Sequence, residues 1–154
     1  MQAMASAGRT DLRLGSFLPY VLNNLAERVS AGMAGIYADE FELSIPEWRV
    51  LANLAEHGTL NARQIVEFTT MEKSKVSRAV NNLSRRGLLS QRRAAGDSRA
   101  KDLQLTGEGE ALYRRIVPRV LAWERDLLDV LSPGEYRDLM YILDKLGKRL
   151  GAGA

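Results

Sequence analysis

Residues 69–106 read TTMEKSKVSRAVNNLSRRGLLSQRRAAGDSRAKDLQLT. This stretch predicts a short helix, a glycine stop and then a basic two-stranded hairpin. Thr69 and Glu72 have the spacing of a capping box, so the helix is expected to begin there. Gly87 is expected to end it in the left-handed conformation. Four residues recur at helical spacing and form one narrow apolar face: Val76, Ala79, Val80 and Leu83.

Positive charge is concentrated in this stretch. Residues 72–101 hold nine Lys and Arg but only two acids, a net charge of +7, whereas the whole chain carries +3. Such local basic character is typical of a nucleic-acid footprint. The alternative is a charged face that is only solvated. Ser and Asn among the cations favour DNA, because these residue types read base edges and phosphates. The face expected to do so contains Lys73, Ser74, Lys75, Ser77, Arg78 and Asn81.

Two shorter helices are expected before this one. Ser44 and Glu47 form a capping box, and Gly58 follows the apolar face of Trp48, Leu51, Leu54 and Ala55. Asn61 and Gln64 form another, which opens a helix of two turns that runs almost directly into the next. Two short helices joined by a tight turn predict a helix-turn-helix whose second helix is the recognition element.

The basic hairpin is expected to be a wing. Residues 88–93 and 100–105 have the pattern of strands, and Gly96-Asp97 is the strongest turn signal between them. A hairpin of this shape can lay cations into a minor groove. The alternative is an exposed hairpin kept soluble by its charge. The cations concerned are Arg92, Arg93, Arg99 and Lys101.

Three long amphipathic helices are expected outside this region. The first runs for about 20 residues from near Leu14, with Ser16 as its N-cap and Pro19 in the first turn. The second follows Thr106 and contains Pro118, which should kink it. The third follows the Ser132–Glu135 capping box. Its side chains expected to point inward are Leu139, Ile142, Leu143, Leu146 and Leu150.

One compact core cannot cover three such apolar faces, so we expect them to interleave with a second copy of the chain. An intramolecular bundle is the alternative. The predicted fold is mainly α with a small β-hairpin wing, a winged helix-turn-helix with long N- and C-terminal dimerisation helices. The predicted divisions are a disordered tail (1–11), a dimerisation helix (12–43), a DNA-binding domain (44–106) and dimerisation helices (107–154).

Composition limits the classes of function. The 154 residues include no Cys and one His, His57, which is expected at a helix end. With no nucleophile elbow or phosphate loop either, we expect no enzyme, no metal and no cofactor. No apolar run approaches the ~18 residues of a membrane span, and no signal peptide is evident, so the expected location is the cytoplasm, without a membrane partner.

Several local strings resemble MarR-type transcriptional regulators. They are S-x-P-E-W-R-V-L-x-x-L from Ser44, K-S-x-V-S-R-x-V-x-x-L from Lys73, R-R-G-L-L from Arg85 and G-D-S-R-A-K-D-L-Q-L-T from Gly96. The resemblance covers about residues 12–150. It implies a homodimeric repressor that binds a pseudo-palindromic operator in double-stranded DNA.

Roles carry over from this resemblance by position. Ser74, Lys75, Ser77 and Arg78 correspond to the recognition-helix contacts. The resemblance further implies that Arg99 enters the minor groove, that Asp97 shapes the wing tip and that Asn61 touches a phosphate.

The resemblance also implies release by a small ligand, often an anionic aromatic or its thioester. The expected lining is Phe17, Tyr20, Asn24 and Arg28 on one side of the first helix, with Trp48 from the second. Aromatics at helical spacing can equally be core residues. Other functions left open are a non-specific architectural DNA-binding protein, a regulator without a ligand, and a protein-binding winged helix.

Overall fold

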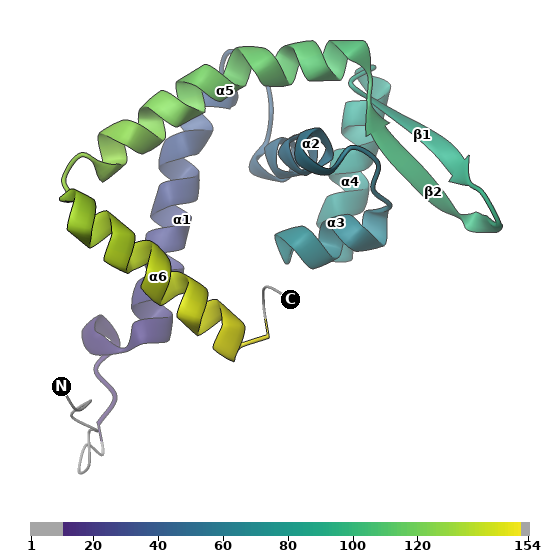
Figure 1. The fold of residues 1–154 in the computed structure, drawn as a ribbon. Helices are drawn as coiled ribbons and strands as arrows, with labels where there is room; N and C mark the ends of the chain where they lie inside the picture. The colour runs from purple at the N-terminus through teal and green to yellow at the C-terminus, as the bar shows by residue number, and fades with distance from the viewer. Residues whose placement is uncertain (1–10, 152–154) are drawn as a thin grey trace.

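The computed structural model describes residues 11–151, so the predicted disordered tail lies outside the described residues except for Asp11. It confirms a mainly α-helical chain with one antiparallel hairpin (Figure 1). The helices are η1 (Leu14–Ser16, 3-10), α1 (Leu18–Tyr37), α2 (Ile45–His57), α3 (Ala62–Thr69), α4 (Lys73–Arg85), α5 (Gly107–Leu128) and α6 (Pro133–Arg149). The strands are β1 (Leu89–Ala94) and β2 (Asp97–Leu105).

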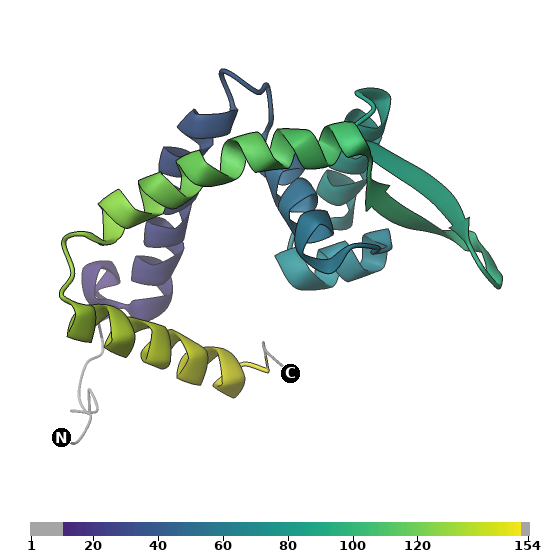
Figure 2. The same ribbon diagram turned by 45° about the horizontal axis from the view of Figure 1, so that its top comes forward.

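The chain divides into a lobe, made of α2, α3, α4 and the hairpin, and three arms, which are the helices α1, α5 and α6. Helices α2, α3 and α4 gather with the hairpin into the lobe, while α5 leads away from the hairpin to α1 and α6 (Figures 1 and 2). Within residues 11–151, no helix combines the length and apolar character needed to cross a membrane.

The hydrophobic core is centred in the lobe. Buried side chains from α2, α3, α4 and β2 meet there, and the arms contribute mainly Tyr37, Ile116 and Val120. Trp48 stacks between Tyr37 (ring centroids 5.3 Å apart) and Tyr113 (5.9 Å). This aromatic stack joins the end of α1 to α2 and α5, so the lobe and the arms meet through a packed contact.

Local capping signals were accurate for most helices. The capping boxes at Ser44, Asn61 and Ser132 are all present, with both reciprocal hydrogen bonds. The expected N-cap at Ser16 was wrong. Ser16 ends the 3-10 turn and its hydroxyl donates to the Arg13 carbonyl at 3.2 Å, so Phe17 takes the cap position.

A glycine sets how α5 meets the hairpin. A Cβ on Gly109 would lie 2.0 Å from the Leu88 carbonyl oxygen, so no larger residue fits. Thr106 caps α5 by accepting from Gly109, and its hydroxyl donates to the Gly87 carbonyl at 2.6 Å. The helix continues through Pro118 and changes direction near its middle, as the proline predicts (Figure 1).

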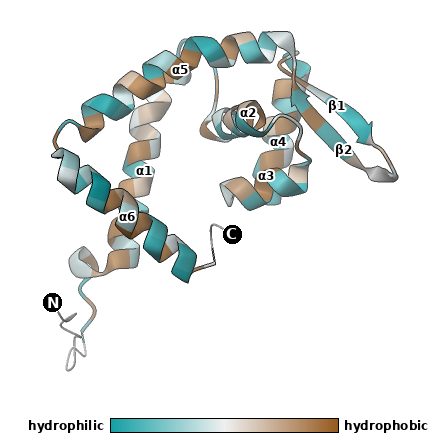
Figure 3. Ribbon diagram, viewed as in Figure 1, coloured by the Kyte–Doolittle hydropathy of each residue, from teal (hydrophilic) through white to brown (hydrophobic). Residues whose placement is uncertain are grey.

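The inward placement predicted for the apolar residues of α6 was wrong for this chain by itself. Leu139, Ile142 and Leu143 are 38%, 51% and 41% exposed, and no residue of α6 is buried. The reason is geometric, because α6 extends away from the other elements instead of closing an intramolecular bundle (Figure 2). Large apolar side chains therefore remain exposed on all three arms, and Figure 3 shows hydrophobic segments along α1, α5 and α6.

Candidate nucleic-acid interface

Helices α3 and α4 form the predicted helix-turn-helix. The turn between them passes through Thr70, which has a left-handed conformation (φ +56°). The capping box expected at Thr69 was wrong, because Thr69 is the last residue of α3 and its hydroxyl donates to the Ile65 carbonyl at 2.6 Å. Glu72 is the N-cap of α4, without a side-chain cap.

The recognition helix α4 divides into two faces as its sequence predicts. Val76, Ala79, Val80 and Leu83 are buried against the lobe. Arg78 donates through Nε to the Ser74 carbonyl at 3.4 Å, which leaves the other donors of its guanidinium for a partner. The residues on the solvent face are Lys73, Ser74, Lys75, Ser77, Arg78 and Asn81. This face is therefore open to a large ligand.

The register of the hairpin separates its cations. Arg93 pairs with Lys101 on the same face as Leu103, whereas Arg92 pairs with Asp102 on the opposite face. Like charges directly opposite one another are unfavourable without an anion between them. Arg93 and Lys101 are thus suited to hold a phosphate.

The tip of the hairpin differs slightly from the prediction. Asp97 already belongs to β2, and the turn is Ala95–Gly96 with a left-handed Gly96 (φ +86°). The roles predicted for the Asp97 and Arg99 side chains lie outside what the structure describes.

A groove of about 440 Å³, lined by both polar and apolar side chains, runs between α4, the start of α3 and the wing. Its polar lining is Asn61, Arg63, Ser77, Asn81, Gln91 and Lys101. Four of these are predicted site residues, which the fold brings together from three elements. Arg63 and Gln91 were missed. Arg63 could have been noticed as a cation in the first turn of a helix, two residues after the predicted phosphate contact Asn61.

A second set of missed residues holds α4 against α2. Glu47 is the one buried charged side chain among the described residues. Its Oε2 accepts from the Ser44 amide at 3.1 Å, and its Oε1 accepts from Asn82 Nδ2 at 3.2 Å. Arg85 in turn donates to Asn82 Oδ1. This chain of hydrogen bonds fixes the C-terminal end of the recognition helix.

Arg86 has a structural role that its charge alone does not reveal. Its guanidinium donates to the carbonyls of Phe41 at 2.9 Å and Glu42 at 2.8 Å. The helix ends where expected, since Gly87 is left-handed (φ +71°) and the Leu88 amide donates to the Leu83 carbonyl at 3.0 Å.

The sequence of this chain is similar to those of known transcriptional regulators. The MarR family model matches residues 41–100. The HTH-type transcriptional regulator PecS of Dickeya dadantii is 32% identical over 114 residues, which are 72% of this chain and 69% of PecS. The chain belongs to the MarR family. It is thus a DNA-binding transcriptional regulator of the winged helix-turn-helix class.

Solved structures agree with this MarR-family assignment. A MarR family transcriptional regulator from Silicibacter pomeroyi is 28% identical, with a TM-score of 0.77 over 88% of this chain and 90% of that one. BpsR of Bordetella bronchiseptica, whose DNA binding is regulated by 6-hydroxynicotinic acid, has the same fold. Its TM-score is 0.78 at 23% identity over 89% of this chain and 97% of BpsR.

The ligand residues expected from the MarR resemblance do not form one cluster. Phe17, Tyr20 and Arg28 are exposed on α1, and Asn24 is half-buried. Trp48 lies in the core stack, where it contacts Tyr37, about 25–30 Å along α1 from the Phe17 end at 1.5 Å per residue. A pocket shared by all five is therefore not formed within one chain. Among the described residues, no three His, Cys, Asp or Glu side chains gather into a metal-binding group either.

Proposed function

We propose that this protein represses transcription by binding a pseudo-palindromic operator as a homodimer, and that a small anionic ligand releases it. The observation that carries the proposal is the pairing of two open surfaces in one chain. The lobe presents the polar face of α4 beside a basic wing. The arms present apolar faces that nothing within residues 11–151 covers. One surface suits DNA and the other suits a second copy.

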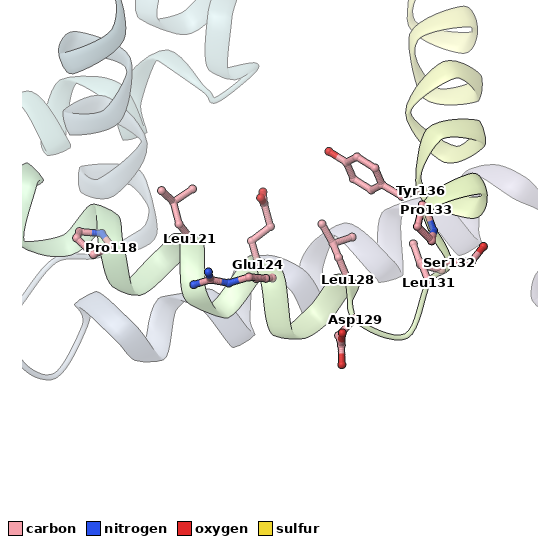
Figure 4. Close-up of a pocket in the computed structure, with 10 residues that line it drawn as sticks. Pro118, Leu121, Glu124, Leu128, Asp129, Leu131, Ser132, Pro133 and Tyr136 are labelled. Carbon is pink, nitrogen blue, oxygen red and sulfur yellow. The ribbon is translucent and has the colours of Figure 1, made fainter.

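The arms favour a homodimer. An exposed apolar area of this extent marks an interaction site. The corner between α5 and α6 encloses about 670 Å³, and Leu121, Leu128 and Tyr136 point to the same side of it (Figure 4). A twofold axis would bring the same corner of the partner against it, since an isologous contact uses one patch twice. Other apolar side chains exposed on the arms include Leu18, Val21, Leu25, Leu139, Met140, Ile142 and Leu143.

Two lobes held at a fixed separation would read two half-sites about 34 Å apart, one turn of DNA. Arg78 would offer its fork to a guanine in the major groove. Lys101 and Arg93 would hold a backbone phosphate, and their contribution would weaken as salt rises. A dimer bound to an operator that overlaps a promoter would block RNA polymerase from that promoter and would thereby repress transcription.

Release by a ligand is favoured by the way the two parts are joined. If a ligand binds more tightly to a dimer with one separation of the lobes than to a dimer with another, its binding changes the affinity for DNA by the ratio of those two ligand affinities. BpsR, a protein of this fold, responds to an aromatic acid, so we propose an aromatic acid or acyl-thioester for this chain as well. A ligand-independent regulator and an architectural protein that coats DNA without sequence choice are the alternatives.

The test is operator selection from random DNA, followed by footprinting and by Arg78→Ala. Two protected half-sites one turn apart are expected. Arg78→Ala should lower the discrimination at one base pair of each half-site by about 1–3 kcal/mol. Arg137→Ala is the matched control, because Arg137 is an exposed cation on α6 that pairs with Asp138.

Protection of a single half-site would contradict the dimer. A ratio of specific to non-specific affinity near one would instead identify an architectural protein.

A further inference from the structure

The capping box of α2 differs from those of α3 and α6 in where its third helical residue lies. Glu47 of α2 is buried, whereas Gln64 of α3 and Glu135 of α6 are exposed. All three side chains accept a hydrogen bond from their N-cap amide, so capping alone does not require burial. A buried carboxylate loses hydration, and hydrogen bonds must offset that loss. The burial of Glu47 therefore reflects a contact outside its own helix.

That contact is with the recognition helix α4, which lies beside α2 in the lobe (Figure 1). Asn82 Nδ2 donates to Glu47 Oε1 at 3.2 Å, and the Ser44 amide donates to Oε2 at 3.1 Å, so each carboxylate oxygen has a partner. Arg85 donates to Asn82 Oδ1. Because Arg85 holds the amide oxygen, the NH₂ group of Asn82 stays turned toward Glu47. The hydrogen bond between α4 and α2 thus has a fixed direction.

Asn82 lies on the flank of α4, beside the side chain expected to read DNA. It follows Arg78 by four residues, which places the two about 40° apart around the helix axis. The buried face of α4 is narrow, since it consists of four residues and one of them is alanine. Apolar packing has no preferred direction, whereas a hydrogen bond does. The Asn82 hydrogen bond therefore restricts rotation of α4 about its own axis more than the apolar face does.

Such a rotation affects base reading more than general attraction to DNA. A turn of about 20° would move atoms roughly 5–6 Å from the helix axis by about 2 Å. This is enough to break the paired hydrogen bonds between a guanidinium and a guanine edge. The attraction between cations and phosphates is less directional and would change little.

We propose that Glu47 and Asn82 are positioning residues for sequence discrimination. Their hydrogen bond sets the rotation of α4 that directs Arg78 toward a base edge. The inference rests on the proposed function, in which Arg78 contacts a guanine of the operator.

The experiment measures the affinity of the full chain for its selected operator and for the same operator with the Arg78-dependent base pair changed. Glu47→Gln places the new NH₂ group against a donor, either the Ser44 amide or Asn82, and Asn82→Asp places two carboxylates together. Each variant should lower the ratio of the two affinities about tenfold. The double variant Glu47→Gln/Asn82→Asp should restore the ratio, because the Gln NH₂ group can donate to the Asp carboxylate at unchanged net charge.

Two controls separate positioning from folding. Glu135→Gln makes the same change in the exposed capping box of α6 and should leave the ratio unchanged. In the Arg78→Ala background, Asn82→Asp should cause no further loss of the ratio, because the side chain that it positions is gone. Should Asn82→Asp fail to fold, Asn82→Ala removes the same hydrogen bond from a half-buried position without adding a charge.

Loss of discrimination in the single variants, recovery in the double variant and no further loss without Arg78 would support the positioning role. An unchanged ratio in the single variants, no recovery in the double variant, or a loss that adds to that of Arg78→Ala would overturn it. A wild type that does not discriminate between the two operators contradicts the proposed function instead. A wild type that discriminates while its single variants keep the ratio contradicts only this inference.

Discussion

At the scale of single residues, Tyr37 at the C-terminal end of α1 is the least satisfied buried side chain among the described residues. Its ring is fully buried against Trp48, and its hydroxyl has no hydrogen-bond partner in the part of the chain that the structure describes. Burial raises the pKa of the Tyr37 phenol, and the nearby positive charge of Arg49 opposes this rise. The neutral phenol is thus retained in the folded chain at a pH where an unfolded chain would lose the proton.

Replacing Tyr37 by Phe should stabilise the fold by about 1 kcal/mol, because it removes a buried hydroxyl without a partner and keeps the stacked ring. Above pH ~10 the unfolded chain binds fewer protons than the folded one, so the stability of the wild type should fall as pH rises. Tyr37→Phe should flatten this fall. Urea unfolding at pH 7 and pH 10.5 measures both effects, and a destabilised Phe variant would mean that the hydroxyl has a partner.

At the scale of elements, the wing is a hairpin with two unlike faces. Arg93 and Lys101 share the face of Leu103, which also lines the groove beside α4, whereas Arg92 lies on the other face opposite Asp102. Arg92 and Arg93 are therefore neighbouring cations in the sequence, but their side chains lie in different surroundings in the structure. On the face of the hairpin that carries Leu103, Arg93 and Lys101 lie opposite one another. This face is therefore better suited to bind a phosphate than the face on which Arg92 lies opposite Asp102.

Lys101→Gln should remove one phosphate contact per lobe. The slope of log affinity against log salt should then become shallower by about 0.9 for each lost contact. Arg92→Gln is the matched control, since it removes the same charge from the opposite face and should change the slope much less. Fluorescence anisotropy on operator DNA from 50 to 200 mM salt would measure both variants. Equal changes in slope would show that the two faces do not differ in DNA contact.

At the scale of the whole molecule, the arms would determine the distance between the two lobes of the proposed homodimer. The Tyr37–Trp48–Tyr113 stack joins the arms α1 and α5 to α2 of the lobe. They also cross tightly, since a Cβ on Gly32 of α1 would lie 2.8 Å from the Trp123 ring of α5. A rigid crossing of this kind would transmit a change at one arm to the spacing of the recognition helices.

Leu143→Glu should separate the dimer without unfolding the lobe. Leu143 is exposed in the single chain and lies outside the core, but a twofold interface would bury the new charge twice. The dimer dissociation constant should rise at least about a hundredfold, since an unpaired buried charge costs about 3–5 kcal/mol. Sedimentation velocity measures this, with Arg137→Glu as the control on the same helix. An unchanged dimer would place the interface elsewhere.

Local signals in the sequence were enough for most elements and for the recognition face. Capping boxes at Ser44, Asn61 and Ser132 act between residues three apart, so they need no tertiary context. The period of Val76, Ala79, Val80 and Leu83 likewise identified the buried face of α4, and with it the exposed one. Where two local signals competed, at Thr69, the connection between two helices overrode the capping box.

Tertiary structure decided what several polar and aromatic side chains outside the helix caps do. Arg86 binds carbonyls 44 and 45 residues away, and Glu47 reaches Asn82 across the lobe. Trp48, predicted as part of a ligand site, lies at the centre of a core stack with Tyr37 and Tyr113. Arg49, one more cation in the sequence, became a half-buried side chain that donates a hydrogen bond to the Ser30 hydroxyl. The sequence determined the helices and their faces because those depend on neighbours along the chain, while burial and pairing depend on segments that meet only after folding.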